Sequence, residues 1–208
     1  MVRVGAHSHA PLLQHAGHYG RRGGVVTDLS RPLIVLDVET QHLAHEVGGW
    51  GNCHKLKVSV AVTYNAATGL YHAYQEEELD DLFQELEGAG KVVGYNLLRF
   101  DYRVLQPYAP PGFSLQSLPT VDLLDHLERR LGFRVSLDAV ATATLGRGKS
   151  ASGVDAVHWF RQGLLEKVIA YCREDVEVTY EVYRFGKERG FVRFWDRTSR
   201  RREVPVSW

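Results

Sequence analysis

The feature that most constrains this chain is an unbroken apolar run that ends in two carboxylates. Residues 33–40 read Leu-Ile-Val-Leu-Asp-Val-Glu-Thr and follow Pro32. A run of this length, rich in β-branched residues, is typical of a buried central strand. Because side chains alternate along a strand, Asp37 and Glu39 are expected on the same face, about 7 Å apart along the chain.

Two carboxylates at the end of a buried strand allow two interpretations. Like charges in that position repel unless a cation lies between them, and hard divalent ions prefer oxygen ligands. Alternatively, the strand runs into a loop and both acids are solvated. Asp37 and Glu39 alone do not distinguish a metal site from a solvated strand end, so the other motifs of the chain decide.

Length and composition exclude several classes of protein. The 208 residues fit one domain with a substantial core, and no apolar stretch approaches the roughly 20 residues of a membrane span. No signal-peptide segment is visible, so we expect no membrane association. Cys53 and Cys172 have neither a metal-ligand spacing nor a disulfide framework, which favours a cytoplasmic protein. Because the net charge is zero, any contact with a polyanion must come from local basic clusters.

Composition also divides the chain into three expected parts. Residues 1–30 are rich in Gly and His and lack a hydrophobic period, so we expect a disordered arm or a start codon placed too early. A metal-binding His tract is the alternative for this arm. Residues 31–187 carry the periodic segments of one domain. Residues 188–208 are expected to form an appended β-hairpin that turns near Thr198 and Ser199.

The periodic segments predict an α/β fold with a mixed sheet. Three antiparallel strands in hairpin order and two later strands are expected at residues 33–40, 56–64, 70–74, 91–95 and 120–122. Helical patterns are expected at residues 76–87, 101–105, 123–131, 136–145, 155–162 and 164–185. Three hairpin strands followed by a β-α-β-α order describe a mixed sheet flanked by helices.

A glycine-rich stretch separates the first two expected strands. Residues 46–54 contain three glycines, which allow unusual backbone angles. We expect a loop here that either caps the end of the sheet or forms a wall of the functional site with Trp50.

Polar residues follow the ends of the expected strands, where open α/β sheets bind ligands. The strand at 91–95 is followed by Asn96, and Asp101 comes five residues later. On the last predicted helix, Tyr171 and Asp175 are four residues apart and therefore share a face. The chain thus carries three motifs in order: Asp37-x-Glu39, Asn96-x4-Asp101 and Tyr171-x3-Asp175.

This ordered set resembles the three motifs of the DEDD (DnaQ-like) exonuclease superfamily, whose members have an RNase H-like fold. Tyr171 makes the chain similar to the tyrosine subclass, because the histidine subclass has His at the position of Ala170. Residues 94–101 and 171–175 resemble the proofreading domains of family B DNA polymerases and the YprB-type RNase H-like proteins of bacteria. The resemblance spans about residues 33–185 and implies an RNase H-like fold.

The resemblance also implies a two-metal phosphodiesterase. Cleavage of an anionic phosphodiester is assisted by two cations, Mg²⁺ or Mn²⁺, about 3.5–4 Å apart. By the resemblance, Asp37 bridges both ions, Glu39 and Asp175 complete one site, and Asp101 serves the other. Tyr171, with an ordinary pKa of about 10, is better suited to orienting the attacking water than to deprotonating it.

A second set of residues is expected to contact the substrate: Thr40, Asn96, Arg99, Phe100 and Lys149. Phe100 either stacks on the terminal base or belongs to the core, and Asn96 either binds the substrate backbone or caps a turn. Family B polymerases usually have Asn at the position of Arg99, so contacts there are expected to differ. Lys149 is expected to meet a phosphate. Asp122 is expected to cap the following helix rather than to bind substrate.

These expectations describe a metal-dependent 3′–5′ exonuclease that releases 5′-mononucleotides from single-stranded nucleic acid, with DNA favoured. Its expected role is DNA repair or nucleic-acid processing, and cleavage mode and polarity follow only from the resemblance. The nearest alternative is a ribonuclease of the same fold, because no residue identifiably reads a 2′-hydroxyl. The other alternative is a non-catalytic module that partners a helicase or a repair protein, although the complete acidic set argues against it.

The C-terminal segment concentrates positive charge. From Lys187 to Glu203, seven basic residues outnumber three acidic ones. Basic side chains on edge strands discourage aggregation, which is one explanation. We also expect Arg200, Arg201 and Arg202 to bind the phosphate backbone without reading bases.

Overall fold

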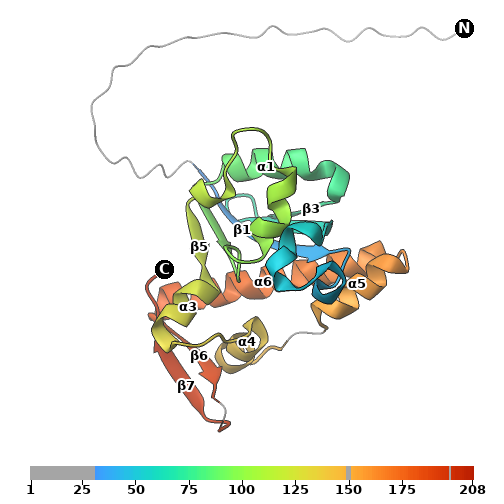
Figure 1. Cartoon of the computed structure of the whole chain (residues 1–208). Coiled ribbons are helices and arrows are strands. Elements are labelled where there is room, and N and C mark those ends of the chain that lie inside the picture. The colour runs from blue at the N-terminus through green and yellow to red at the C-terminus, as the bar shows by residue number, and fades with distance from the viewer. Residues whose placement is uncertain (1–30, 149–150, 197) are drawn as a thin grey trace, which may run out of the picture.

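The computed structural model describes residues 31–148, 151–196 and 198–208. The expected arm at residues 1–30 and Lys149 lie outside these residues. Figure 1 shows a sheet covered by helices, with a separate two-stranded hairpin near the C-terminus.

The main sheet has five strands in the order β3-β2-β1-β4-β5. β1 (Leu33–Thr40) pairs antiparallel with β2 (Val58–Asn65), which pairs antiparallel with β3 (Leu70–Tyr74). On its other side β1 pairs parallel with β4 (Lys91–Gly94), and β4 pairs parallel with β5 (Thr120–Asp122). The predicted mixed α/β sheet, with three antiparallel strands followed by parallel ones, is therefore confirmed.

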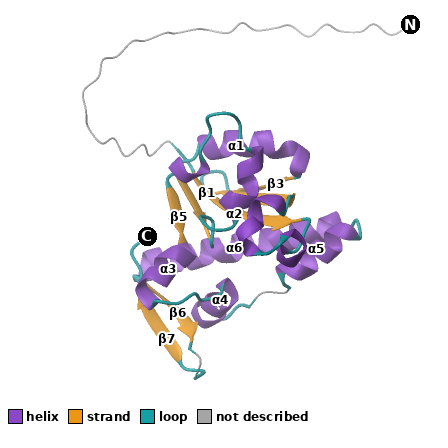
Figure 2. Cartoon of the chain, viewed as in Figure 1, coloured by secondary structure: helices purple, strands orange, loops and turns teal. Residues whose placement is uncertain are grey.

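Helices cover both faces of this sheet (Figure 2). On one face, Ile34 and Leu36 of β1 lie in a buried cluster with α1 (Leu79–Glu87) and α2 (Asp101–Leu105). On the other face, the long α6 (Leu165–Arg189) packs across β1 and β2. Burial on both sides explains why these strands are nearly continuous apolar runs.

Side-chain alternation in β1 decides where its carboxylates point. Val35 lies in the buried cluster that contains the apolar side chains of α6. Residues two positions apart on a strand share a face. Asp37 and Glu39 therefore face α6, which carries Tyr171 and Asp175.

The remaining helices lie close to their expected positions. α3 (Leu123–Leu131), α4 (Leu137–Leu145) and α5 (Gly153–Arg161) match the helical patterns to within about two residues. The expected helix at 76–87 begins with a 3₁₀ turn, η3 (Glu76–Glu78), before α1. Two further 3₁₀ turns are η4 (Gln106–Tyr108) and η5 (Leu115–Ser117).

The glycine-rich stretch after β1 is more ordered than the expected loop. It forms two 3₁₀ helices, η1 (Ala44–Val47) and η2 (Trp50–Lys55). Gly48 and Gly49 join them with φ angles of 85° and 99°, in the left-handed region that side chains disfavour. The glycines therefore form a tight joint between two short helices.

The predicted C-terminal hairpin is present as β6 (Phe191–Trp195) and β7 (Arg201–Pro205). Its apolar side chains, including Val192 and Val204, belong to the same buried cluster as Val168 of α6. Among the described residues, none of the helices combines the length and the apolar character that crossing a lipid bilayer requires.

Candidate functional site

Three carboxylates meet where β1 ends beside α6. Asp37, Glu39 and Asp175 each offer one oxygen atom, and these three atoms lie within 4.8 Å of one another. Glu39 and Asp175 are buried, whereas Asp37 is half-buried. Hard divalent cations bind carboxylate oxygens at about 2.0–2.6 Å, so oxygens at this spacing fit around one such ion. The cluster has the composition and the spacing of a site that could hold a metal.

Asp101 lies beside this cluster at the start of α2, with only 2% of its surface exposed. Burial, and then the negative charge of Asp37, raise the pKa of Asp101 well above its usual range. Its Oδ1 atom has no hydrogen-bond partner among the described residues. A cation bound beside Asp101 would stabilise the charged form of this buried carboxyl group.

Tyr171 lies one helical turn before Asp175, and its hydroxyl donates a hydrogen bond to the Asp175 carboxylate. Burial, and then the charges of Asp175 and Glu39, raise the pKa of Tyr171 far above its ordinary value. The ring packs edge-on against Trp159, with centroids 6.2 Å apart. The hydroxyl therefore stays protonated at neutral pH and acts as a positioned donor.

Cys172 belongs to the site although no motif indicates it. Its thiol donates hydrogen bonds to the main-chain oxygen and to Oδ2 of Asp37, with Sγ 3.4 Å and 3.3 Å away. Burial, and then the charge of Asp37, raise the pKa of Cys172 well above its usual range, so the thiol stays protonated. The helical period places Cys172 on the buried stripe, but only the fold brings Asp37 beside it.

A cavity of about 620 Å³ opens beside the carboxylates. Thr40 lines it, although its hydroxyl donates to the main-chain oxygen of His42, 3.0 Å away. Its mainly apolar opposite wall comes from η1, η2, α5 and the turn before α2, including Leu43, Trp50, Phe100 and Val154. Ligand sites in proteins have volumes in this range, so the cavity is large enough for a substrate group.

Phe100 lines this cavity instead of lying wholly in the core. Its ring meets Trp50 edge to face, with centroids 6.0 Å apart. The guanidinium group of Arg103 donates a hydrogen bond to the main-chain oxygen of Gly51, which ties η2 to α2. The two aromatic side chains therefore form a wall whose position is fixed by α2.

Asn96 and Arg99 face a second cavity of about 420 Å³ next to the first. Asn96 has a positive φ of 78°, and its main-chain N–H donates to Oδ1 of Asp122 at 2.8 Å. Its side-chain oxygen accepts a hydrogen bond from Arg134 at 2.7 Å. Arg99 pairs with Glu128, 3.1 Å away. Asn96 also lines a cavity together with Asp37, whereas Arg99 shares the second cavity with Trp50 and Phe100. Asn96 is held by Arg134, a partner that no motif indicates.

Asp122 organises the backbone around this region. Besides Asn96, its carboxylate accepts from the main-chain N–H groups of Leu98, Leu124 and Asp125. It thus caps α3, as expected, and also holds the turn that leads to α2.

Arg103 and Arg134 complete the surroundings of the second cavity. Arg103 lies two residues after Asp101 on α2, whereas Arg134 comes from the turn between α3 and α4, and no spacing in the sequence links Arg134 to the carboxylates. Lys149, by contrast, lies outside the described residues, so its expected phosphate contact stays a prediction.

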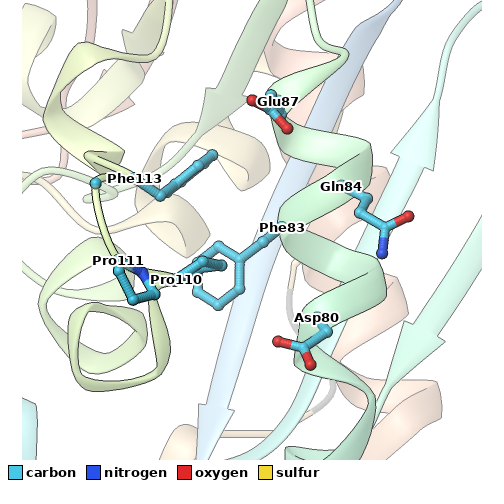
Figure 3. A pocket seen from close by; sticks show the side chains of 8 residues that line it. Asp80, Phe83, Gln84, Glu87, Pro110, Pro111 and Phe113 are labelled. Atoms are coloured by element: carbon cyan, nitrogen blue, oxygen red, sulfur yellow. The ribbon is translucent and has the colours of Figure 1, made fainter.

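Another cavity, of about 430 Å³, lies between α1 and the proline-rich segment at 110–113 (Figure 3). Phe83 and Phe113 line it and pack edge to face, with ring centroids 5.3 Å apart. Asp80 and Glu87 lie along its α1 side. None of the predicted site residues lines this cavity, so the carboxylate cluster remains the candidate site.

Comparisons with known proteins identify a family and a similar fold. A family model described as the RNase_H superfamily matches residues 34–185. Among solved structures, the crystal structure of Trypanosoma brucei RNase D is similar, with a TM-score of 0.54 and 12% sequence identity. The match covers 75% of this chain and 57% of that chain, so this chain spans less than two thirds of its neighbour. None of the curated proteins compared with the chain matches it.

Proposed function

The chain belongs to the RNase H superfamily, and from this we propose that it is a metal-dependent 3′–5′ exonuclease of single-stranded nucleic acid. We favour DNA as substrate and nucleic-acid processing or repair as role. The observation that carries the proposal is the convergence of Asp37, Glu39 and Asp175 within 4.8 Å, beside the buried Asp101. The arrangement supports the tyrosine-subclass DEDD assignment, because Tyr171 bonds to the last carboxylate of the set.

The four carboxylates would hold two divalent cations, Mg²⁺ or Mn²⁺. We assign Asp37 to both ions, Glu39 and Asp175 to one, and Asp101 to the other. Burial and the charge of Asp37 raise the pKa of Asp101, so its charged form is unfavourable without a nearby positive charge. This supports a cation next to Asp101. When bound, such ions make a water molecule more acidic and offset the charge that develops on the oxygens of a phosphodiester.

In this proposal the side chains around the metal ligands position the water, the Asp37 carboxylate and the substrate, and they do not transfer protons. The hydroxyl of Tyr171 stays protonated, so it can orient an attacking water but cannot accept its proton. The thiol of Cys172 holds the Asp37 carboxylate from the side of α6. Trp50 and Phe100 form an aromatic wall on which a terminal base can stack.

Contacts between two walls of the 620 Å³ cavity support cleavage at the end of a nucleic-acid strand. Arg161 of α5 forms an ion pair with Glu46 of η1 at 2.6 Å and donates to the main-chain oxygen of Gln41 at 3.2 Å. These contacts join two walls of the 620 Å³ cavity. A cavity whose walls are joined accepts the end of a strand more readily than its middle.

RNA is the second candidate substrate. The similar solved structure is that of a protein named RNase D, and at 12% identity this likeness concerns the fold alone. The same catalytic groups would act on either polymer, because neither the metal ligands nor Tyr171 needs a 2′-hydroxyl. DNA and RNA therefore have to be compared in one assay.

The test uses the full chain with labelled single-stranded DNA and RNA, each blocked at the 3′ or the 5′ end. We expect release of 5′-mononucleotides with Mg²⁺ or Mn²⁺, only from strands with a free 3′ end, and none with EDTA. Cleavage of 3′-blocked strands would contradict the direction, and cleavage in EDTA would contradict the metal requirement. Tight Mn²⁺ binding without hydrolysis of either polymer would favour a non-catalytic module.

A further inference from the structure

The cavity of about 430 Å³ between α1 and residues 110–113 combines aromatic and acidic side chains (Figure 3). None of the proposed metal ligands lines it. We propose that this cavity binds a basic peptide segment of a partner protein, with Lys or Arg residues about three positions apart. The inference goes beyond the proposed function, because it involves none of the residues assigned to hydrolysis.

One side of α1 forms the acidic wall of the cavity. Asp80, Phe83, Gln84 and Glu87 line it and recur at positions i, i+3, i+4 and i+7, so they share one side of the helix. Phe83 is buried, whereas Asp80 and Glu87 are exposed. The helix therefore presents an apolar surface between two carboxylates that lie two turns, or about 10.5 Å, apart along its axis.

The opposite wall is a tight turn with the sequence Pro-Pro-Gly-Phe at residues 110–113. The main-chain N–H of Phe113 donates to the main-chain oxygen of Pro110 at 2.9 Å, and Gly112 has a φ of 84°. Proline at the second position and glycine with a positive φ at the third are typical of a type II turn. This turn holds Phe113 against Phe83, so the cavity is already formed and the entropic cost of binding a peptide is reduced.

The charge around the cavity is acidic and has no basic counterpart in the segments that form it. Residues 71–90 contain seven acidic residues and no Lys or Arg, and residues 106–119 contain no charged residue. Within the part of the chain that the structure describes, the carboxylates of Asp80 and Glu87 take part in no ion pair and no hydrogen bond. A phosphate backbone would be repelled here, whereas Lys and Arg side chains would be attracted. Charge complementarity therefore favours a basic peptide over a nucleic acid.

The separation of the two carboxylates sets the spacing of the basic residues. A peptide in the polyproline II conformation, which aromatic-lined grooves commonly bind, rises about 3.1 Å per residue and has about three residues per turn. Side chains three positions apart therefore share a side of the peptide and can reach both Asp80 and Glu87. The aliphatic stems of Lys or Arg can cover Phe83 and Phe113 while their charged ends reach the carboxylates.

The chain's own residues 1–30 are the alternative occupant. Their only Lys or Arg residues are Arg3, Arg21 and Arg22, and no two of these are three positions apart. A partner protein is therefore the favoured source of the peptide, and the experiment distinguishes the two.

The experiment measures binding of fluorescent nine-residue peptides to the full chain by anisotropy. Three peptides carry two Arg residues one, three or six positions apart in an otherwise uncharged sequence, and a fourth carries Glu in place of both. We expect the tightest binding at a spacing of three and none for the Glu peptide. Binding should weaken as salt is added, because exposed ion pairs are screened.

Two double variants separate the cavity from the general charge of this segment. Asp80→Asn combined with Glu87→Gln removes both cavity carboxylates and should weaken binding of the peptide with a spacing of three about tenfold. Asp81→Asn combined with Glu77→Gln is the matched control, since it removes the same charge from exposed residues of the same segment that do not line the cavity. The control should keep nearly the wild-type affinity, and thermal unfolding checks the fold of both variants.

The inference is overturned if no peptide binds, if the three Arg spacings bind alike, or if the two double variants lose affinity equally. Arg21→Glu combined with Arg22→Glu tests the alternative occupant. If peptides bind only to this variant, the cavity belongs to the chain's own residues 1–30 and the proposal of a partner protein is wrong.

Discussion

The thiol of Cys172 lies 3.3 Å from Oδ2 of Asp37 and donates a hydrogen bond to it. A second contact, at 3.4 Å, joins the same sulfur to the main-chain oxygen of Asp37. These contacts fasten α6, which carries Tyr171 and Asp175, to the strand that carries Asp37. The two halves of the candidate site are thus positioned by a buried contact between neighbouring elements.

Cys172→Ala removes the donor and is expected to weaken Mn²⁺ binding about tenfold, as the loss of a group that orients a ligand typically does. Cys172→Ser keeps a donor at the same position and should restore most of this affinity. Calorimetric titration of Mn²⁺ into both variants measures the effect. Equal Mn²⁺ affinities for the Ala variant and the wild-type chain would show that the thiol only fills space.

Tyr171→Phe removes a hydroxyl but no proposed metal ligand. We expect turnover to fall by about 10²-fold, within the usual range for a positioned group, while Mn²⁺ affinity stays unchanged. Single-turnover hydrolysis and Mn²⁺ titration on the same preparation separate the two effects. If the variant fails to bind Mn²⁺, Tyr171 lies in the metal shell and its assigned role is wrong.

The ion pair between Glu46 and Arg161 gives a pH prediction. The hydrogen bond from Arg161, followed by that from the main chain of Leu43, lowers the pKa of Glu46 from 4.5 to about 2. The stabilisation from a lowered carboxyl pKa is fully present above 4.5 and is lost as the pH falls toward 2. The stabilisation from the contact between η1 and α5 should therefore be complete down to about pH 4.5, and the ion pair itself should persist until the pH approaches 2.

NMR titration of the Glu46 carboxyl group checks this directly. In the wild-type chain it should still be ionised at pH 3.5, whereas in Arg161→Ala it should titrate near its ordinary value. A wild-type midpoint near 4.5 would mean that the ion pair does not form in solution.

Of the three hairpin arginines that we expect to bind phosphate, Arg202 already has an acidic partner. Arg202 pairs with Asp196 at 2.8 Å, and Asp196 also accepts from the main-chain N–H of Arg200 in the turn. Arg200→Ala with Arg201→Ala should therefore weaken binding of single strands and flatten its salt dependence, with turnover at saturating substrate nearly unchanged. Arg202→Ala is the comparison variant that disturbs the turn. Wild-type affinity and an unchanged salt slope in the double variant would limit the hairpin to a structural role.

Much of the fold could be predicted because its signals are local. The run at 33–40 became β1, and the pattern at 101–105 became α2, because hydrophobic periodicity reflects burial directly. α6 continues to Arg189, beyond its expected end at 185, because the last turn is polar and carries little hydrophobic period. Gly190 ends the helix in the left-handed conformation, a signal that was present in the sequence.

The candidate site was only partly predictable. The order of three motifs on compatible elements predicts that Asp37, Asp101 and Asp175 lie near one another. The partners of these residues, such as Cys172 for Asp37 and Arg134 for Asn96, are contacts between distant segments. Such contacts have no period and no fixed spacing, so a single sequence does not indicate them.

The most direct test of the account is Asp37→Asn, which removes one charge from the ligand assigned to both metal ions and preserves the size of the side chain. Mn²⁺ stoichiometry, hydrolysis of a 3′-accessible single strand and thermal unfolding are measured on the variant and on the wild-type chain. We predict two bound ions and hydrolysis for the wild-type chain. For the variant we predict fewer bound ions, a rate lower by more than about 100-fold and nearly unchanged unfolding. A variant within about tenfold of the wild-type rate, roughly 1.4 kcal/mol of barrier, would contradict the two-metal account.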